Sequence, residues 1–337
     1  MSVLQGGHLR RGAGRRKGGR NRGTRRHRGP SRHRWLLVSL MLVLALIALL
    51  ALMAGRASCP SLPAARHVVV KAPAAPARSP YGIAPAPRQV TVHLKLPLKS
   101  GLLFNVRTGQ VLWARDPQAV IPIASLTKMM TALVVVEHVA PTAKAQITKD
   151  VVHFSGSGMG VLPLGKRVSV LTLLYGLLLP SGNDAAIALA QRVAGTQSRF
   201  IGMMNAQARA MGLRCTHFTT VSGIVDRGNY SCVADMALLA HAVLTQPLLA
   251  RIVGSRSAVM PLPIKGGKVW LYNNNPLYLL GYPGTDGVKT GLTTAAGHCL
   301  VAAARRGGRW LGVVLLHSAN TGPQAVTLLN AGFASWR

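Results

Sequence analysis

The most informative segment of this 337-residue chain is IPIASLTKMMTALVVVEHVA, residues 121–140. From Ser125 onward its apolar residues follow a helical spacing, and Pro141 is expected to end the helix. Ser125 and Lys128 are three residues apart, so they lie on the same face of the first turn. A serine needs a base beside it to act as a nucleophile, and a lysine kept neutral by burial can be that base. The pair is therefore a candidate nucleophile and base, although a lone SxxK is more often a helix cap followed by a solvated lysine.

A second polar motif lies in LLLPSGNDAAIALAQRV, residues 177–193. Ser181 and Asn183 occupy a short polar turn between two apolar segments with helical spacing. We expect Asp184 to cap the second of these helices. On its own such a turn is an ordinary helix-capping loop, so its weight depends on the motifs around it.

A third motif lies in GTDGVKTGLTTAAGHCLVAAARR, residues 284–306. Lys289, Thr290 and Gly291 follow a glycine-rich turn and are predicted to lie in a strand. A lone KTG would be a strand end with a surface lysine. However, SxxK and KTG each occur once in the chain, and the motifs appear in the order SxxK, SxN, KTG.

Together the three motifs resemble those of the penicillin-recognising serine enzymes. The segments ASLTKMMT, SGNDAA and TDGVKTGLT are most similar to the serine D-alanyl-D-alanine carboxypeptidases, the low-molecular-weight penicillin-binding proteins of peptidase family S11. MNAQARAMGLRCTHF, NYSCVADMALLAHAVL and NNNPLY agree as well, so the resemblance covers roughly residues 98–318. It implies an α+β fold, an α/β/α sandwich in which helices flank an antiparallel sheet. A helical subregion would carry the SGN turn, with Ser125 in a cleft between the two parts.

The resemblance also implies a role for the residues around the reacting bond. Ser125 would attack the carbonyl between the two terminal D-alanines of a peptidoglycan stem peptide and form an acyl-enzyme, and Lys128 would be its general base. Ser181 would relay a proton toward the leaving amine, and Asn183 would hold the substrate backbone. β-Lactams, which mimic D-alanyl-D-alanine, are the implied inhibitors.

The third motif would bind the end of the substrate. Lys289 and Thr290 would bind the terminal carboxylate, and Gly291 would let substrate lie close to the strand edge. The backbone N–H groups of Ser125 and Leu292 would form the oxyanion hole, where some relatives carry a histidine in place of Leu292. The resemblance implies no cofactor and no metal.

Three other functions stay open at this point. A β-lactamase shares SxxK and KTG, but the class A type deacylates with a glutamate well downstream of the serine, and the only glutamate here is Glu137. A transpeptidase of the same fold would use an amine instead of water as the acceptor. A non-catalytic, membrane-tethered module that binds wall polymer is the alternative from a different class.

Acidic residues are too few and too dispersed for most metal chemistry. The formal net charge is +33, with only 7 Asp and Glu, and no two of them lie within eight residues of each other. This excludes EF-hand loops and local DxD sites, and no HExxH motif occurs. The acidic residues are Asp116, Glu137, Asp150, Asp184, Asp226, Asp235 and Asp286.

The first part of the chain predicts a membrane protein. Residues 1–34 are rich in Arg and Gly and are expected to be a disordered cytoplasmic tail, with no nucleic acid as partner. Residues 35–54, WLLVSLMLVLALIALLALMA, carry no charge and are long enough to span a bilayer, with a cleaved signal peptide as the alternative. Residues 55–89 are rich in Pro and Ala and predict a tether. The catalytic domain, 90–337, would then lie outside a bacterial cell membrane that the chain crosses once.

The four cysteines show no spacing typical of a metal site. In an oxidising compartment Cys215 and Cys232 could form a disulfide. Isolated buried thiols are an equal alternative, and the residues do not decide between the two.

Overall fold

The computed structural model describes residues 82–160 and 162–335, which all belong to the second of two units into which the chain divides, Pro73–Arg337. The predicted basic tail and membrane span lie outside the described residues. The end of the predicted tether is described, and it lies against a strand: Ala84 N donates to Gly109 O at 3.2 Å, and Ala86 N donates to Val111 O at 2.9 Å. The sheet therefore begins a few residues before the expected start at 90.

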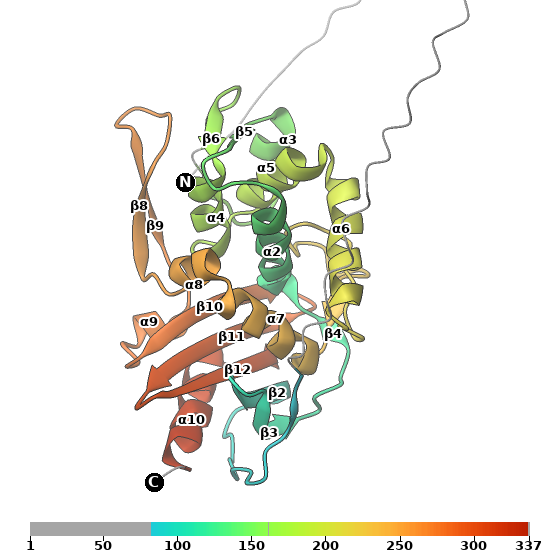
Figure 1. Ribbon diagram of the computed structural model, residues 1–337, viewed down its shortest axis with the longest axis vertical. Coiled ribbons are helices and arrows are strands. Elements are labelled where there is room, and N and C mark those ends of the chain that lie inside the picture. The colour runs from blue at the N-terminus through green and yellow to red at the C-terminus, as the bar shows by residue number, and fades with distance from the viewer. Residues whose placement is uncertain (1–81, 161, 336–337) are drawn as a thin grey trace, which may run out of the picture. The chain divides into compact units, whose positions relative to one another are not determined.

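A six-stranded sheet forms the centre of the described fold, in the spatial order β1-β3-β2-β12-β11-β10 (Figure 1). β1 runs parallel to β3, and every other neighbouring pair in this sheet is antiparallel. This confirms the predicted α+β class. The strands are β1 (Ala84–Pro85), β2 (Leu98–Asn105), β3 (Gln110–Arg115), β10 (Thr285–Thr293), β11 (Gly297–Arg306) and β12 (Arg309–Ser318).

Helices and three small antiparallel ribbons surround this sheet. The ribbons are β4 (Ile121–Pro122) with β7 (Tyr230–Ser231), β5 (Lys144–Gln146) with β6 (Arg167–Ser169), and β8 (Ser257–Pro261) with β9 (Lys268–Tyr272). The helical elements are the 3₁₀ turn η1 (Ala124–Thr127), α2 (Lys128–His138), α3 (Lys149–Val152), α4 (Val170–Leu178), α5 (Asn183–Ala194), α6 (Gln197–Ala210), α7 (Val233–Thr245), α8 (Pro247–Val253), α9 (Pro276–Leu279) and α10 (Thr321–Ala334).

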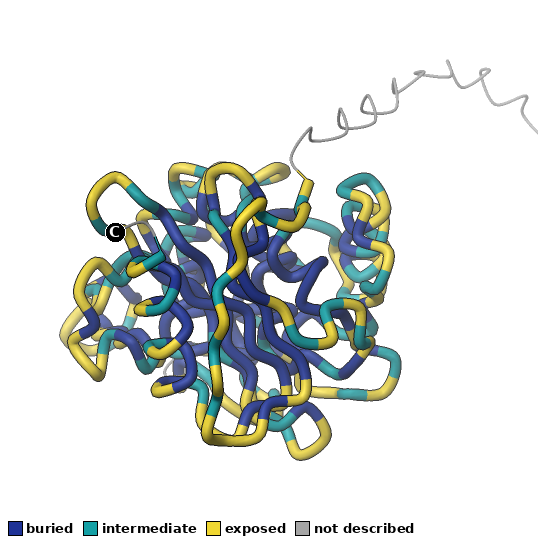
Figure 2. The backbone as a smooth tube through the Cα atoms, turned by 90° about the horizontal axis from the view of Figure 1, so that it is seen from below, coloured by how far each residue is buried: buried dark blue, intermediate teal, exposed yellow. Residues whose placement is uncertain are grey.

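Both faces of the sheet are buried, because successive apolar side chains of its strands point to opposite sides. On β12, Val313 packs in the cluster that includes the apolar side chains of α10, whereas Val314 packs in the larger cluster that includes α2 and α7. Figure 2 shows the strands as a buried centre with exposed loops around it. The sheet is thus the middle layer, with α10 and the short α9 on one side and the large helical cluster around α2 on the other.

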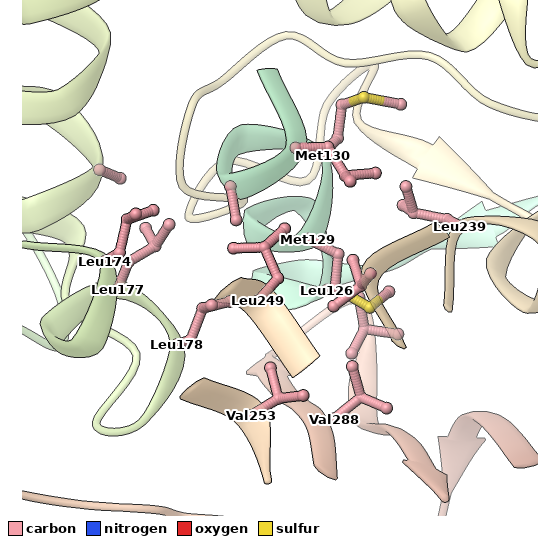
Figure 3. Close-up of a cluster of buried hydrophobic side chains, with 14 of the residues drawn as sticks. Leu126, Met129, Met130, Leu174, Leu177, Leu178, Leu239, Leu249, Val253 and Val288 are labelled. Carbon is pink, nitrogen blue, oxygen red and sulfur yellow. The ribbon is translucent and has the colours of Figure 1, made fainter. Parts of the chain in front are cut away.

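Helix α2 lies inside the larger cluster and positions the first motif. All of its residues from Lys128 to Val135 are buried, as expected for a helix that is covered on every side. Figure 3 shows Met129 and Met130 of this helix among apolar side chains of α4, α7 and α8. Lys128 is the first residue of this buried helix, so its amine is shielded from water together with the core residues that follow it.

Cys215 and Cys232 form a disulfide, which decides between the two alternatives left by the sequence, while Cys299 is a buried free thiol. Among the described residues no single helix has the length and hydropathy of a membrane span; only α7 and α8, bent by 102° at their junction, meet the criteria as a pair.

Candidate active site

The turn that carries Ser125 is held between two chain segments that approach it closely. A Cβ atom on Gly291 of β10 would lie 3.2 Å from Ser125 N and 3.0 Å from Ile123 O. On the other side, Gly223 has φ of +79°, and a Cβ there would meet the backbone of Ala124. Both glycines therefore let backbone pack directly against η1, which fixes where Ser125 lies.

Lys128 is fully buried and its amine contacts three oxygen atoms. Nζ lies 2.8 Å from Ser125 Oγ, 2.7 Å from Asn183 Oδ1 and 2.7 Å from the carbonyl oxygen of Ser222. Burial, followed by repulsion from Lys289, holds the pKa of Lys128 well below its usual range, against a smaller opposing effect of Asp184. The amine is thereby shifted toward its neutral form.

The partners of Lys128 determine how a neutral amine is oriented. Asn183 Nδ2 donates to Ser155 O at 2.6 Å, so its Oδ1 atom is the one that faces Lys128. Asn183 Oδ1 and Ser222 O can only accept, and they take the two N–H bonds of a neutral amine. The nitrogen lone pair then points at the third partner, the hydroxyl of Ser125, which can donate its proton along this contact.

The SGN turn is anchored by its backbone as well as by the side chain of Asn183. Gly182 N donates to Gly176 O at 2.8 Å, and Asn183 N donates to Ser157 O at 2.8 Å. Ser181 has φ of +72°, an uncommon conformation for a residue with a side chain, and it lines the cavity described below. The turn is therefore built to present Ser181 in one fixed orientation.

Asp184 does not cap α5, contrary to the expectation from the sequence. The residue before the helix is Gly182, and no side-chain cap is present. The buried carboxylate of Asp184 lies within the helix and accepts from the N–H of the next residue, Ala185, at 2.8 Å. It also accepts from the backbone N–H of Met159 at 2.8 Å and of Gly160 at 3.3 Å. It thus ties the 157–160 segment to the start of α5, and burial raises its pKa despite these bonds.

In the third motif, Lys289 is buried, which corrects the surface position that a lone KTG would suggest. Its Nζ donates to Thr290 O at 2.9 Å, and no acidic side chain in the described residues pairs with it. Burial lowers the pKa of Lys289 from 10.5 to about 7. A buried amine without a counter-ion would be relieved by an anionic ligand.

A cavity of about 280 Å³ joins the three motifs. Of the predicted residues, Ser125, Ser181, Thr290, Gly291 and Leu292 line it, whereas Lys128, Asn183 and Lys289 are buried and are not part of its lining. The other lining residues belong to none of the three motifs; they are Ser157, Asn274, Pro276, His298, Cys299 and Thr321. The predicted residues therefore form one site, with the amines behind the hydroxyls.

The segment NNNPLY, residues 273–278, connects two of the motifs. Asn274 N donates to Leu179 O at 3.2 Å, and Asn274 Nδ2 donates to Pro180 O at 3.2 Å, both just before the SGN turn. The neighbouring Asn275 Nδ2 donates to Gly287 O at 2.5 Å, on β10. Adjacent asparagines thus fix the spacing between the SGN turn and the KTG strand.

The described residues do not offer a convincing metal centre. One group has the proximity that ligation needs, Cys215, Cys232 and Asp235, but both cysteines are in the disulfide. Asp235 accepts from Cys215 N at 2.6 Å and from Thr216 Oγ1 at 2.7 Å, so it supports the disulfide loop.

A serine beside a buried lysine of lowered pKa, with an SxN turn and a KTG strand on this α+β fold, defines the class of acyl-serine enzymes that recognise penicillin. Within that class, residues 88–320 match the sequence profile of the family Peptidase S11, D-alanyl-D-alanine carboxypeptidase. The chain belongs to this family, which confirms the resemblance seen in its motifs.

Individual relatives agree with this assignment. The chain is 36% identical over 248 residues to the D-alanyl-D-alanine carboxypeptidase DacB2 of Mycobacterium tuberculosis, covering 71% of this chain and 83% of the relative. It is 33% identical over 214 residues to the D-alanyl-D-alanine carboxypeptidase DacF of Bacillus subtilis, covering 62% of this chain, but it spans only 54% of that longer relative. The crystal structure of the Streptomyces K15 DD-transpeptidase superposes with a TM-score of 0.68 at 32% identity, covering 72% of this chain and 100% of that one.

Proposed function

We propose that the protein is a serine-type D-alanyl-D-alanine carboxypeptidase that removes the terminal D-alanine from peptidoglycan stem peptides. The observation that carries this proposal is the set of contacts around Lys128, which leaves a neutral amine with its lone pair toward Ser125 Oγ. The family membership supplies the substrate class, and the lack of a counter-ion at Lys289 among the described residues supports a substrate that ends in a carboxylate.

Acylation would begin at Ser125. Its Oγ atom attacks the carbonyl carbon of the penultimate D-alanine, and the hydroxyl proton passes to Nζ of Lys128. The backbone N–H groups of Ser125 and Leu292 are proposed to stabilise the oxyanion. The peptide C–N bond then breaks, the leaving amine takes a proton through Ser181, and D-alanine departs.

Substrate binding and deacylation complete the cycle. The terminal carboxylate is proposed to bind at Lys289 and Thr290, where an anion restores the charged form of the buried amine. Asn183 holds both Lys128 and the substrate backbone in this scheme. Water then attacks the ester on Ser125 and gives a proton to Lys128. The ester C–O bond breaks, the shortened peptide leaves, and Lys128 returns the proton to Ser125 Oγ.

Covalent labelling of the full chain in detergent tests the proposal. A β-lactam should leave a stable adduct on Ser125, located by mass spectrometry, and the Ser125→Ala variant should remain unlabelled. Intact drug with unlabelled protein would overturn the enzymatic function in favour of a binding module. Hydrolysed drug without a lasting adduct would favour a β-lactamase.

Transfer to an amine is the second candidate activity, because the Streptomyces K15 structure is described as a DD-transpeptidase. The two activities differ only in the acceptor that reaches the acyl-enzyme. Incubating the chain with a D-alanyl-D-alanine peptide and an excess of glycine distinguishes them: free D-alanine with shortened peptide indicates hydrolysis, and a peptide ending in glycine indicates transfer.

We also propose that residues 35–54 anchor the chain in the bacterial cell membrane, with the catalytic domain outside. The uncharged twenty-residue stretch, the basic residues before it and the disulfide support this topology. Protease added to intact spheroplasts should remove the domain while leaving residues 1–34 protected. Release of the domain by alkaline carbonate without protease would contradict the anchor.

A further inference from the structure

The β8–β9 ribbon carries an exposed stripe that the proposed mechanism does not use. Along β9 and the residues after it, burial alternates strictly: Val269, Leu271 and Asn273 are buried, and the residues between them are exposed. The exposed members are Lys268, Trp270, Tyr272 and Asn274. Because side chains two apart lie on the same face of a strand, Lys268, Trp270 and Tyr272 form one row on β9. Asn274 continues the alternation of burial two residues beyond the end of the strand.

The partner strand widens this stripe. Val259 of β8 lies opposite Trp270, and Ser257 lies opposite Tyr272. Trp270 and Tyr272 are 60% and 65% exposed, and Val259 is 53% exposed, so this face of the ribbon has no covering element among the described residues. Figure 1 shows the ribbon standing out from the body of the domain.

The stripe ends at the catalytic cavity. Asn274, its last member, lines the cavity together with Ser125, and Pro276 two residues later lines it too. The side chain of Asn274 is also bonded to Pro180 O, beside the SGN turn. A ligand that lies along Trp270 and Tyr272 therefore continues into the site where the peptide would be cut.

We propose that this stripe binds the amino-sugar end of the substrate, the glycan to which the stem peptide is attached. This inference rests on the proposed function, because it extends the ligand outward from the cavity. Pyranose rings present C–H groups on their faces, which pack against the electron-rich faces of Trp and Tyr. Hydroxyl and acetamido groups of the sugar find polar partners in Lys268 and Asn274.

Charge on the ribbon fits a wall polymer that carries carboxylates. Arg256, Lys265 and Lys268 are exposed, and no acidic residue lies between Asp235 and Asp286 in the sequence. Cations along the ribbon strengthen and orient the encounter with an anionic ligand. The stripe thus combines sugar-binding aromatic faces with a positive border.

A membrane surface also attracts aromatic and basic side chains, but the order of residues disfavours it here. The turn at the tip, residues 263–267, contains Pro, Ile, Lys and two Gly and carries no aromatic residue. The aromatic residues lie on the part of β9 that leads into the cavity. An inserting hairpin would place its aromatic residues at the tip instead.

The test compares two substrates with the full chain in detergent: a disaccharide-pentapeptide and the free pentapeptide of the same sequence. In the Trp270→Ala, Tyr272→Ala double variant we expect KM for the disaccharide substrate to rise about tenfold or more, as for other ligands whose rings stack on removed aromatic side chains. Turnover of the free pentapeptide and β-lactam acylation of Ser125 should stay unchanged. Equal losses on both substrates, or no loss on the disaccharide substrate, would overturn the proposal.

Matched variants distinguish a loss of aromatic stacking from a general loss of substrate binding. Trp270→Phe keeps an aromatic face and should retain most of the preference for the disaccharide substrate. Lys268→Gln should weaken it, whereas Lys144→Gln, which changes an exposed strand lysine on β5, should not. Disaccharide kinetics that are unchanged in Trp270→Ala, Tyr272→Ala and in Lys268→Gln alike would overturn the sugar site.

A direct binding measurement keeps the inference separate from the catalytic proposal. A peptide-free tetramer of β-1,4-linked N-acetylated amino sugars is titrated into the Ser125→Ala chain, and the heat of binding is followed by calorimetry. A saturable signal that disappears when Trp270→Ala and Tyr272→Ala are added supports the site even if the chain cleaves no peptide. No binding, in a chain that does cleave the free pentapeptide, would overturn the sugar site and leave the proposed function intact.

Discussion

Nζ of Lys128 lies 2.8 Å from Oγ of Ser125, and the other two contacts of this amine are to oxygens that can only accept. This arrangement makes the orientation of the proposed base a consequence of packing. The amine is held in the core at the start of α2, so neutralisation costs little and protonation would bury an unpaired cation. The cavity wall presents the hydroxyl, and the base remains behind it.

Replacing Lys128 should therefore abolish acylation while leaving Ser125 in place. Lys128→Arg introduces a guanidinium group that stays protonated, so the new side chain cannot accept the proton of the serine hydroxyl. We expect the acylation rate by a β-lactam to fall about 10²- to 10⁴-fold, the usual contribution of a general base. Stopped-flow or gel-based labelling measures the rate, and an unchanged rate would show that another group is the base.

Two neighbouring charges should shift the pH dependence of acylation in opposite directions. Lys289 lowers the pKa of Lys128, and Asp184 raises it. Lys289→Met should therefore raise the pKa of Lys128 and move the acid limb of the rate profile to higher pH, whereas Asp184→Asn should move it to lower pH. Acylation rates measured from acidic to alkaline pH locate the limb in each variant; a shift of both variants in the same direction would mean that the limb reports another group.

Gly291→Ala should impair catalysis more than folding. The added Cβ would lie 3.0 Å from Ile123 O and 3.2 Å from Ser125 N, so η1 must move by a few tenths of an ångström away from β10. Small displacements of a nucleophile are costly, and we expect a loss in acylation rate of about tenfold or more. Thermal unfolding should change little, and a large fall in Tm would show instead that the contact is mainly structural.

The disulfide should contribute substantially to stability. It joins residues separated by 17 positions, and a loop of that length corresponds to about 3 kcal/mol in the chain-entropy account. The Cys215→Ser, Cys232→Ser double variant should lower the free energy of unfolding by about this amount in denaturant titrations. The wild-type chain should show the same loss after reduction, and equal stability of reduced and oxidised wild type would contradict this role.

Side-chain motifs, but not their backbone supports, can be recognised in the sequence. Ser125, Ser181 and Lys289 are each visible because a motif names a side chain. The carbonyl oxygen of Ser222, which orients Lys128, has no such signature, because every residue has one. The close backbone approach at Gly223 depends on a positive φ that the sequence does not display. These supports are set by tertiary contacts between distant segments.

One other feature differs from the expectation for a physical reason. Asp184 stands where an acidic cap is common, but it is the second residue of α5, and its carboxylate accepts from the 159–160 backbone as well as from Ala185 N. The alternation from Lys268 to Asn274 is a period-two pattern that is visible in the sequence, although its continuation into the cavity depends on the fold. The membrane span predicted at 35–54 stays a prediction.

The buried cation at Lys289 should make stability depend on pH with a definite sign. Burial lowers the pKa of Lys289 from 10.5 to about 7, while the unfolded chain keeps the ordinary value. Below pH 7 both states bind the proton, and the fold carries the full cost of the buried charge. Between about pH 7 and 10.5 only the unfolded state stays protonated, so the free energy of unfolding rises with pH and the cost is gone above that window.

Lys289→Met removes this cost without adding a polar group to the core. The variant should therefore be more stable than wild type at about pH 6, by an amount on the order of a few kcal/mol, and the difference should shrink as pH rises toward about 10. Urea titrations of both chains at about pH 6, 8 and 10 measure it, and taking the difference between the two chains cancels the titration of other groups. A difference that stays constant across these pH values would show that Lys289 keeps its proton in the fold.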